Sequence, residues 1–258
     1  MLFKGLKMPK LLKFGLSLLL LFFSNIFASP VDKITFMTEN SPPSNFLKNK
    51  QLKGTAVDLL IKMLEKVKAK QKREDIIVLP WSRAYSYVQS QKNSSLFATT
   101  RTAKREKLFK WVGPISQIMI TLIAKKSKHV KISNLEDLKK YKIGVVREDI
   151  GEQILLNLNV DKKQIENTGG IDAIHKVIKM LNRDRFDVLS YNEESAFIEI
   201  NKLGFEGSDY ERVYVLSKSE LYYAFHIDTS EEVITTLQNA LDELKKDGTY
   251  DKIFDFYK

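Results

Sequence analysis

The sequence contains no cysteine and only three histidines, and these shortages exclude several kinds of chemistry. Without cysteine the chain forms no disulfide, has no thiol nucleophile and offers no thiol for a lipid anchor. His129, His175 and His226 lie far apart, and none has a second histidine at the spacing of a zinc ligand pair. We therefore expect neither a catalytic metal site nor a bound cofactor.

Several motifs of catalysis and nucleic-acid binding are also missing. The eleven glycines form neither a phosphate-binding loop nor a GxGxxG fingerprint, and no GxSxG nucleophile elbow occurs. The 32 acidic residues offer many carboxylate pairs by chance, so no pair indicates acid–base catalysis. The lysines form no basic stripe with interleaved aromatic residues, so nucleic acid is not an expected partner. A binding protein without catalysis fits these absences best.

The first 28 residues differ from the rest of the chain. Lys4, Lys7, Lys10 and Lys13 occur there with no acid, before the apolar run FGLSLLLLFFSNIF and a small residue, Ala28. This order is typical of a secretory signal peptide, and we expect cleavage near Ala28; the alternative is an uncleaved anchor. Loss of four lysines from 42 basic residues leaves 38 against 32 acids, a net charge of about +6 instead of +10. An exported chain without a lipid anchor is expected in the periplasm.

The remaining sequence predicts two similar α/β units. In the first, strands are expected at 33–38, 75–79, 96–98 and 115–124, with helices after Gly54 and at 82–91. In the second, strands are expected at 142–146 and 186–190, with helices after 133, after 151 and at 172–181. Further strands at 213–216 and 221–227 precede two C-terminal helices separated by Gly248. This order favours mostly parallel sheets in two lobes, joined by two crossings that form a hinge.

Four segments resemble, in order, the family-3 periplasmic solute-binding proteins, the polar-amino-acid class that serves ABC importers. The segments are TENSPPSNFLKNKQLKGTAVDLL (38–60), TTRTAKREKLFKWVGPI (99–115), DLKKYKIGVVREDIGEQIL (137–155) and ALDELKKDGTYDKIFDFY (240–257). The resemblance covers about residues 33 to 258. It implies a two-lobed, type II periplasmic-binding-protein-like α/β fold with two crossover hinge strands. The expected division is a signal peptide at 1–28, lobe 1 at 29–118 and 219–258, and lobe 2 at 119–218.

The resemblance also implies a carboxylate site in the second segment. In the family, the arginine of this element binds the ligand's α-carboxylate with help from a hydroxyl and a backbone N–H five residues earlier. Arg105 and Thr100 stand at these positions, and Thr99 adds a neighbouring hydroxyl. The planar guanidinium fork matches a carboxylate, and such a pair is strong in a closed cleft. The alternative for Arg105 is a solvated helix residue.

Three other candidates are expected in lobe 1. Phe46 stands where the family has an aromatic wall, and Trp81 and Arg83 add an aromatic face and a second guanidinium. The alternative for Phe46 and for Trp81 is packing in the core of lobe 1.

The second lobe departs from the family pattern. Asp149 stands in the loop that begins a helix, where it either caps the helix or faces a ligand cation. The position of the family's ammonium-binding aspartate, five residues after Asp187, is occupied by Asn192, which carries no charge. This favours a carboxylate without an α-ammonium, or a modified peptide-like molecule.

The leading hypothesis is a monomeric, non-catalytic receptor that closes its lobes on a small polar solute, with ABC permease subunits as candidate partners. One alternative is an enzyme on the same scaffold, similar to a cyclohexadienyl dehydratase, for which Glu39, Asp149 and Glu194 are the candidate acids. Another is a soluble ligand-sensing partner of a membrane signalling protein.

Overall fold

A computed structural model describes residues 29–257 of the chain, so the expected signal peptide lies outside the described residues. The strands are β1 (Thr35–Thr38), β2 (Phe46–Lys48), β3 (Gln51–Lys53), β4 (Ile77–Val78), β5 (Ser94–Thr100), β6 (Phe109–Lys125), β7 (Ile143–Val146), β8 (Ile165–Thr168), β9 (Val188–Asn192) and β10 (Tyr210–His226). The α-helices are α1 (Thr55–Lys66), α2 (Trp81–Ser90), α3 (Ile150–Asn157), α4 (Ala173–Asn182), α5 (Glu193–Lys202), α6 (Glu231–Lys246) and α7 (Thr249–Phe256). Short 3-10 helices occupy Pro30–Lys33, Arg73–Asp75, Lys126–Lys128, Leu135–Lys140, Lys162–Gln164 and Gly207–Asp209.

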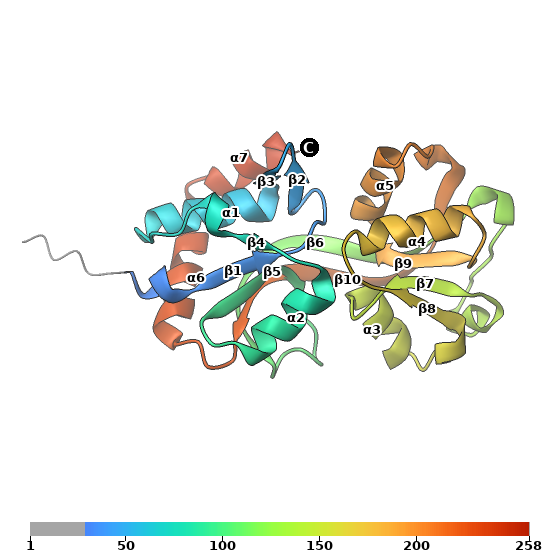
Figure 1. The fold of residues 1–258 in the computed structure, drawn as a ribbon, viewed down its shortest axis with the longest axis horizontal. Helices are drawn as coiled ribbons and strands as arrows, with labels where there is room; N and C mark the ends of the chain where they lie inside the picture. The colour runs from blue at the N-terminus through green and yellow to red at the C-terminus, as the bar shows by residue number, and fades with distance from the viewer. Residues whose placement is uncertain (1–28, 258) are drawn as a thin grey trace, which may run out of the picture.

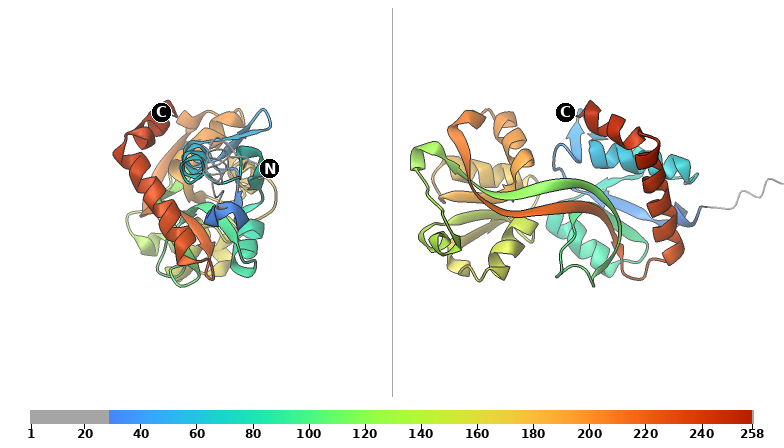
Figure 2. Two further views of the ribbon diagram at one scale, coloured as in Figure 1. Left: turned by 90° about the vertical axis from the view of Figure 1, so that its left-hand side faces the viewer. Right: turned by 180° about the vertical axis from the view of Figure 1, so that it is seen from behind.

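Two long strands connect two lobes, as Figure 1 shows. The first lobe contains β1, β4 and β5 with α1, α2, α6 and α7, and the second contains β7, β8 and β9 with α3, α4 and α5. β6 and β10 run antiparallel beside each other through both lobes, which is clear from behind in Figure 2. The strands of both lobes and these two long strands form one eight-stranded sheet with the order β4-β1-β5-β10-β6-β9-β7-β8. The two-lobed α/β prediction is confirmed.

One sheet extends through both lobes because β10 and β6 pair with strands of different lobes. β10 pairs with β5 over Leu221–Phe225, whereas β6 pairs with β9 over Ile120–Ala124. The lobe boundaries expected at 118/119 and 218/219 fall between these two pairings. β2 and β3 form a separate antiparallel pair, whereas the other strands of this sheet pair in parallel, β1 with β4 and β5, and β7 with β8 and β9. The expectation of mostly parallel sheets holds for these strands.

Each lobe buries its own apolar core. In α1, Val57, Leu60 and Leu64 recur at helical spacing on one face and are buried against the sheet, as their spacing predicts. Phe36 of β1 meets Phe225 of β10 edge to face, with ring centroids 6.2 Å apart. A separate cluster in the second lobe packs α4 and α5 on the sheet. Each lobe therefore has a buried apolar core of its own.

Several elements differ from the sequence prediction. The two strands expected at 213–216 and 221–227 are one strand, β10, because β6 pairs with it along its whole length. The β2–β3 hairpin, β8 and α5 were not predicted, and β6 begins at Phe109 instead of Ile115. The cap expected at Ser133 lies one residue later, where Asn134 and Asp137 form the capping box.

Gly151, in the first turn of α3, allows this helix to approach β9 closely. A Cβ atom at this position would lie 2.6 Å from the backbone oxygen of Ser190. We expect Gly151→Ala to lower the free energy of unfolding by about 1–3 kcal/mol, because backbone must move. In thermal unfolding the midpoint should fall by about 2–4 °C per kcal/mol. Gly169→Ala is the matched control, since its Cβ would meet only the flexible Arg147 side chain at 3.5 Å. Equal midpoints for the two variants would contradict the prediction.

Candidate functional site

The two lobes meet along a cleft that has two adjacent parts. The inner cavity, about 30 Å³, is lined by Glu39, Ser41, Trp81, Ala98, Thr100, Ile118, Ile120, Asp149, Ile150, Tyr191, Asn192 and Leu221. The outer hollow, about 540 Å³, is lined by residues of both lobes, including Arg83, Arg147, the loop 169–172 and His175. Glu39, Trp81 and Tyr191 line both parts, so the cavity and the hollow lie on either side of the same three residues.

Arg105 is a buried cation beside this cleft: it lines neither the inner cavity nor the outer hollow, but its guanidinium stands against Trp81, which lines both. It follows β5 in the chain and is fully buried, with its guanidinium over the rings of Trp81 and Tyr85 at 5.1 and 5.0 Å from their centroids. Nη1 donates to the Thr100 oxygen at 3.1 Å, and Nη2 donates to the Glu148 oxygen of the other lobe at 3.4 Å. Nε is buried and has no hydrogen-bond partner within residues 29–257. Burial lowers the pKa of Arg105 from its usual value, and nearby groups that include Tyr85 and Asp149 act in the opposite direction and raise it.

The guanidinium therefore has one satisfied edge and one unsatisfied edge. The Nη1 side is anchored to the lobe that carries Arg105, while Nε and Nη2 face away with one missing and one long bond. Nε and Nη2 are the parallel pair that a carboxylate accepts in a bidentate contact. A buried donor left without a partner costs about 1–3 kcal/mol, which an anionic ligand would offset.

Two carboxylates share the cleft with Arg105. Burial raises the pKa of Glu39 well above its usual range, the nearby Asp149 raises it further, and Arg105 opposes the shift. Burial also raises the pKa of Asp149, and the first backbone N–H groups of α3 and Arg105 oppose it. Asp149 stands at the N-cap position of α3, next to the N–H groups of Ile150 and Gly151. When both acids are ionised, Arg105 alone cannot balance their charge, and the raised pKa values reflect this together with burial.

Four hydrogen bonds join the lobes directly. Trp81 Nε1 donates to the Glu148 oxygen at 2.8 Å, beside the Arg105 bond to the same oxygen. At the cleft edge, Asn40 donates to Glu199 at 3.4 Å, and the hydroxyls of Ser41 and Ser195 lie 3.3 Å apart. The lobes are thus closed on each other, and the inner cavity has room for about one or two water molecules.

The structure brings together some of the predicted site residues. Trp81, Thr100, Asp149 and Asn192 line the inner cavity, and Arg83 lines the outer hollow. The Asn192 side chain accepts from the N–H of Ser195 and caps α5.

Two predicted residues lie apart from these. Thr99 is buried and its hydroxyl donates to the Leu96 oxygen at 3.0 Å, within β5. Phe46 packs edge to face on Tyr257, with centroids 6.1 Å apart, and lines a separate hollow with Pro42 and Pro43. The β2–β3 hairpin causes this placement, because it turns Phe46 toward the C-terminal helix.

Sequence reasoning missed four cleft residues as ligand contacts. Glu39 appeared only as an acid for the alternative enzyme, and Tyr191, Arg147 and His175 were not proposed. Glu39 directly follows β1 and Arg147 directly follows β7. Both stand at the carboxyl end of a parallel strand, the edge at which open α/β sheets bind ligands. That signal was available in the sequence.

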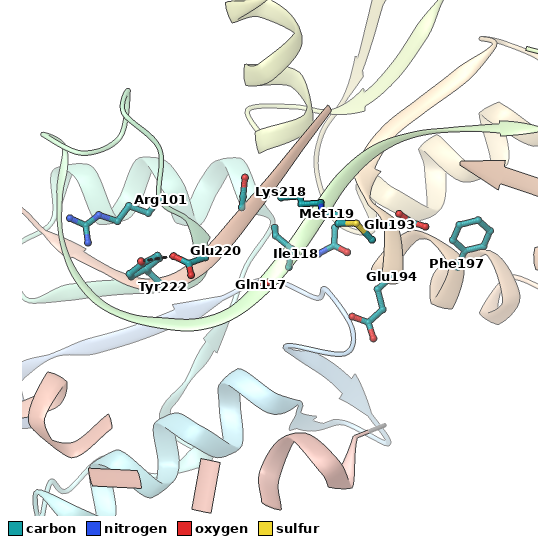
Figure 3. A pocket seen from close by; sticks show the side chains of 12 residues that line it. Arg101, Gln117, Ile118, Met119, Glu193, Glu194, Phe197, Lys218, Glu220 and Tyr222 are labelled. Atoms are coloured by element: carbon teal, nitrogen blue, oxygen red, sulfur yellow. Dashed lines mark hydrogen bonds between the residues drawn. The ribbon is translucent and has the colours of Figure 1, made fainter. Parts of the chain in front are cut away.

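A third hollow, about 970 Å³, lies against the hinge strands and not around Arg105. Figure 3 shows Arg101 and Tyr222 at one end of it and Glu193, Glu194 and Phe197 at the other. Arg101 forms a bidentate pair with Glu106 at 2.6 and 2.8 Å, so its charge is already neutralised. The cleft with the unsatisfied Arg105 therefore remains the candidate site.

The described part of the chain has neither a metal-binding cluster nor a membrane-spanning helix. No group of three or more His, Cys, Asp or Glu side chains suited to a metal ion occurs between residues 29 and 257. Over the same range, no helix is long and apolar enough to cross a membrane.

Comparison with solved structures places the fold. A histidine kinase sensor domain with similarity to periplasmic binding proteins matches with a TM-score of 0.75 and 18% identity, covering 86% of this chain and 95% of that one. A Streptococcus pneumoniae ABC uptake transporter substrate-binding protein with bound histidine matches with a TM-score of 0.74 and 16% identity, covering 89% of this chain and 94% of that one. An ancestral arginine-binding protein bound to arginine matches with a TM-score of 0.73 and 23% identity, covering 87% and 98%. At these identities the likeness establishes the fold alone.

Sequence comparison identifies the family. No curated protein sequence matches this chain. The family model of the bacterial extracellular solute-binding proteins, family 3, matches residues 34–258, which is nearly all of the chain. The chain therefore belongs to the bacterial extracellular solute-binding proteins of family 3.

Proposed function

We propose that this protein is a periplasmic receptor that binds a small carboxylate-bearing, amino-acid-like solute between its lobes and delivers it to an ABC importer. The unsatisfied Nε and Nη2 edge of the buried Arg105 is the observation that carries this proposal. In the closed arrangement of the lobes, Arg105 Nη2 donates to the backbone oxygen of Glu148, at the position where one carboxylate oxygen of a ligand would accept. A ligand carboxylate would replace this single long bond with two charge-assisted ones.

The acids of the cleft supply a place for a ligand cation. Asn192, at the position expected for the ammonium partner, is neutral and already caps α5. Glu39 and Asp149 lie in the same inner cavity and have raised pKa values because of burial and, for Glu39, because of the neighbouring Asp149. An ammonium group between them would favour their ionised forms. A ligand with both a carboxylate and an amine therefore matches the charges of these side chains better than a plain carboxylate does.

Binding requires the lobes to separate and close again. The inner cavity of about 30 Å³ is smaller than any amino acid, so a ligand enters only after the Trp81 and Arg105 bonds to the Glu148 oxygen break. β6 and β10 are the connections about which the lobes would move, near the proposed boundaries at 118/119 and 218/219. The proposal includes a monomer, export by a signal peptide cleaved near Ala28, and no catalysis.

Thermal unfolding against a ligand panel tests this function. The protein is first unfolded and refolded to remove carried-over ligand, and the panel holds amino acids, dicarboxylates, aromatic acids, polyamines and short peptides. A ligand at a hundred times its dissociation constant stabilises by about 2.7 kcal/mol, or roughly 5–10 °C for a chain of this size. Shifts confined to carboxylate-bearing compounds support the proposal. Midpoint shifts with polyamines, together with no shift for any carboxylate-bearing compound, would overturn it.

A further inference from the structure

The outer hollow carries charges that the proposed amino-acid head group does not use. It is lined by the cations Arg83, Arg147 and Lys202 and by the carboxylates Glu39 and Asp172, with His175 also at its wall. Glu39 also lines the inner cavity, where Arg105 acts on it. Lys202 and His175 both bond the buried Glu199. Two arginines and one aspartate remain, a net positive charge.

Neither arginine is neutralised. Arg83, on α2 in the first lobe, is exposed, and its side chain makes no hydrogen bond or ion pair with any described residue. Arg147, directly after β7 in the second lobe, makes one long bond, from Nε to the Asn167 amide oxygen at 3.3 Å, and no ion pair in the part of the chain that the structure describes. The two guanidiniums therefore belong to opposite walls of one hollow, and closing the lobes brings like charges toward each other.

The hollow between these arginines is apolar. Its lining includes Leu79, Pro80, Trp81, Val146 and Ile174. Its volume of about 540 Å³ lies within the range of small-molecule sites, and it adjoins the inner cavity at Trp81 and Tyr191, which line both. A ligand held by its head group at Arg105 would extend an apolar spacer along Trp81 and reach the arginines with its far end.

We propose that the ligand carries a second, distal anionic group, a carboxylate or a phosphate, which is bound between Arg83 and Arg147 across the cleft. This inference rests on the proposed function, because the head group is taken to bind at Arg105. The distal anion bridges the two lobes and offsets the repulsion between the arginines, so it contributes to closure as well as to affinity. Guanidinium forks suit both candidate anions.

The test compares compounds that share a head group and differ only at the far end. We would titrate the refolded protein calorimetrically with L-2-aminoadipate, L-2-amino-5-phosphonopentanoate, L-norleucine and L-lysine, and in parallel with adipate, hexanoate and 6-aminohexanoate. The anion-terminated members should bind roughly 10- to 100-fold more tightly than the methyl-terminated ones. This preference should shrink when salt is raised from 0.05 to 0.5 M, since both arginines are exposed. Carboxylate and phosphonate members distinguish the two anions.

Variants separate this inference from the proposed function. Arg83→Gln and Arg147→Gln should each reduce the distal-anion preference about tenfold without weakening norleucine binding, because each variant removes one of the two charges that repel each other on closure. The double variant should remove the preference. Arg185→Gln removes an exposed guanidinium elsewhere in the second lobe and serves as the control. If no anion-terminated compound outbinds its methyl counterpart, or if the preference survives in the double variant, the inference is wrong. If the preference persists but Arg105→Ala changes nothing, the proposed head-group site fails instead.

Discussion

Arg105→Ala should weaken binding of the solute that gives the largest thermal shift by about 100- to 1000-fold. The variant removes both charge-assisted bonds of the Nε and Nη2 edge, each worth about 1.5–3 kcal/mol. Arg105→Lys should weaken binding by about 10- to 100-fold, because it keeps a charge but loses the fork. Isothermal titration calorimetry of the refolded variants measures both effects, and circular dichroism checks that the fold is retained.

Arg101 provides a matched control for Arg105. It lies four residues earlier, also after β5, but its guanidinium is paired with Glu106 and stacked near Trp111 and Tyr222. We expect Arg101→Ala to change affinity less than about twofold, because a satisfied surface pair contributes little. Unchanged affinity in Arg105→Ala, or an equal loss in Arg101→Ala, would show that the carboxylate site is elsewhere.

Much of this architecture could be predicted from the sequence because local patterns carry it. The apolar spacing of Val57, Leu60 and Leu64 fixes the buried face of α1, and Gly248 separates the two C-terminal helices where the structure has them. The long hinge strand β10 was predicted as two strands. Its middle, between Leu216 and Leu221, is polar and looks like a turn, and only pairing with β6 makes it a strand.

The candidate site was harder to predict, because its contacts join distant parts of the chain. Arg105 and Trp81 both bond to the backbone oxygen of Glu148, and a backbone acceptor leaves no mark in the sequence. Glu39 meets Asp149 only because the lobes close on each other, so neither local spacing nor residue type indicates their proximity. Phe46 was misplaced relative to the cleft for a similar reason, since the β2–β3 hairpin was not predicted.

Glu39→Gln should stabilise the ligand-free protein at neutral pH while it weakens binding of a cation-bearing solute. Burial, with a further contribution from Asp149, raises the pKa of Glu39 well above its usual range. The folded protein therefore binds this proton more tightly than the unfolded chain does. As a result, the contribution of Glu39 to stability falls as the pH rises from about 4, the pKa of an ordinary glutamate, toward the raised pKa. Because glutamine cannot ionise, the Glu39→Gln variant does not lose stability in this way as the pH rises.

The expected signature is a difference that depends on pH. At pH 7 the unfolding midpoint of Glu39→Gln should exceed that of the wild type by about 2–4 °C, the effect of about 1 kcal/mol, and the two should converge near pH 4. Affinity for an amine-bearing ligand should fall about tenfold or more, while a plain carboxylate loses nothing. Glu166→Gln, on the exposed face of β8, should change neither quantity. Parallel pH profiles for wild type and Glu39→Gln would contradict this account. Glu39→Gln is expected to raise stability and lower affinity for one physical reason. An ionised acid in a narrow cleft without a full counter-charge destabilises the ligand-free protein, and a ligand ammonium group offsets that cost only when it binds.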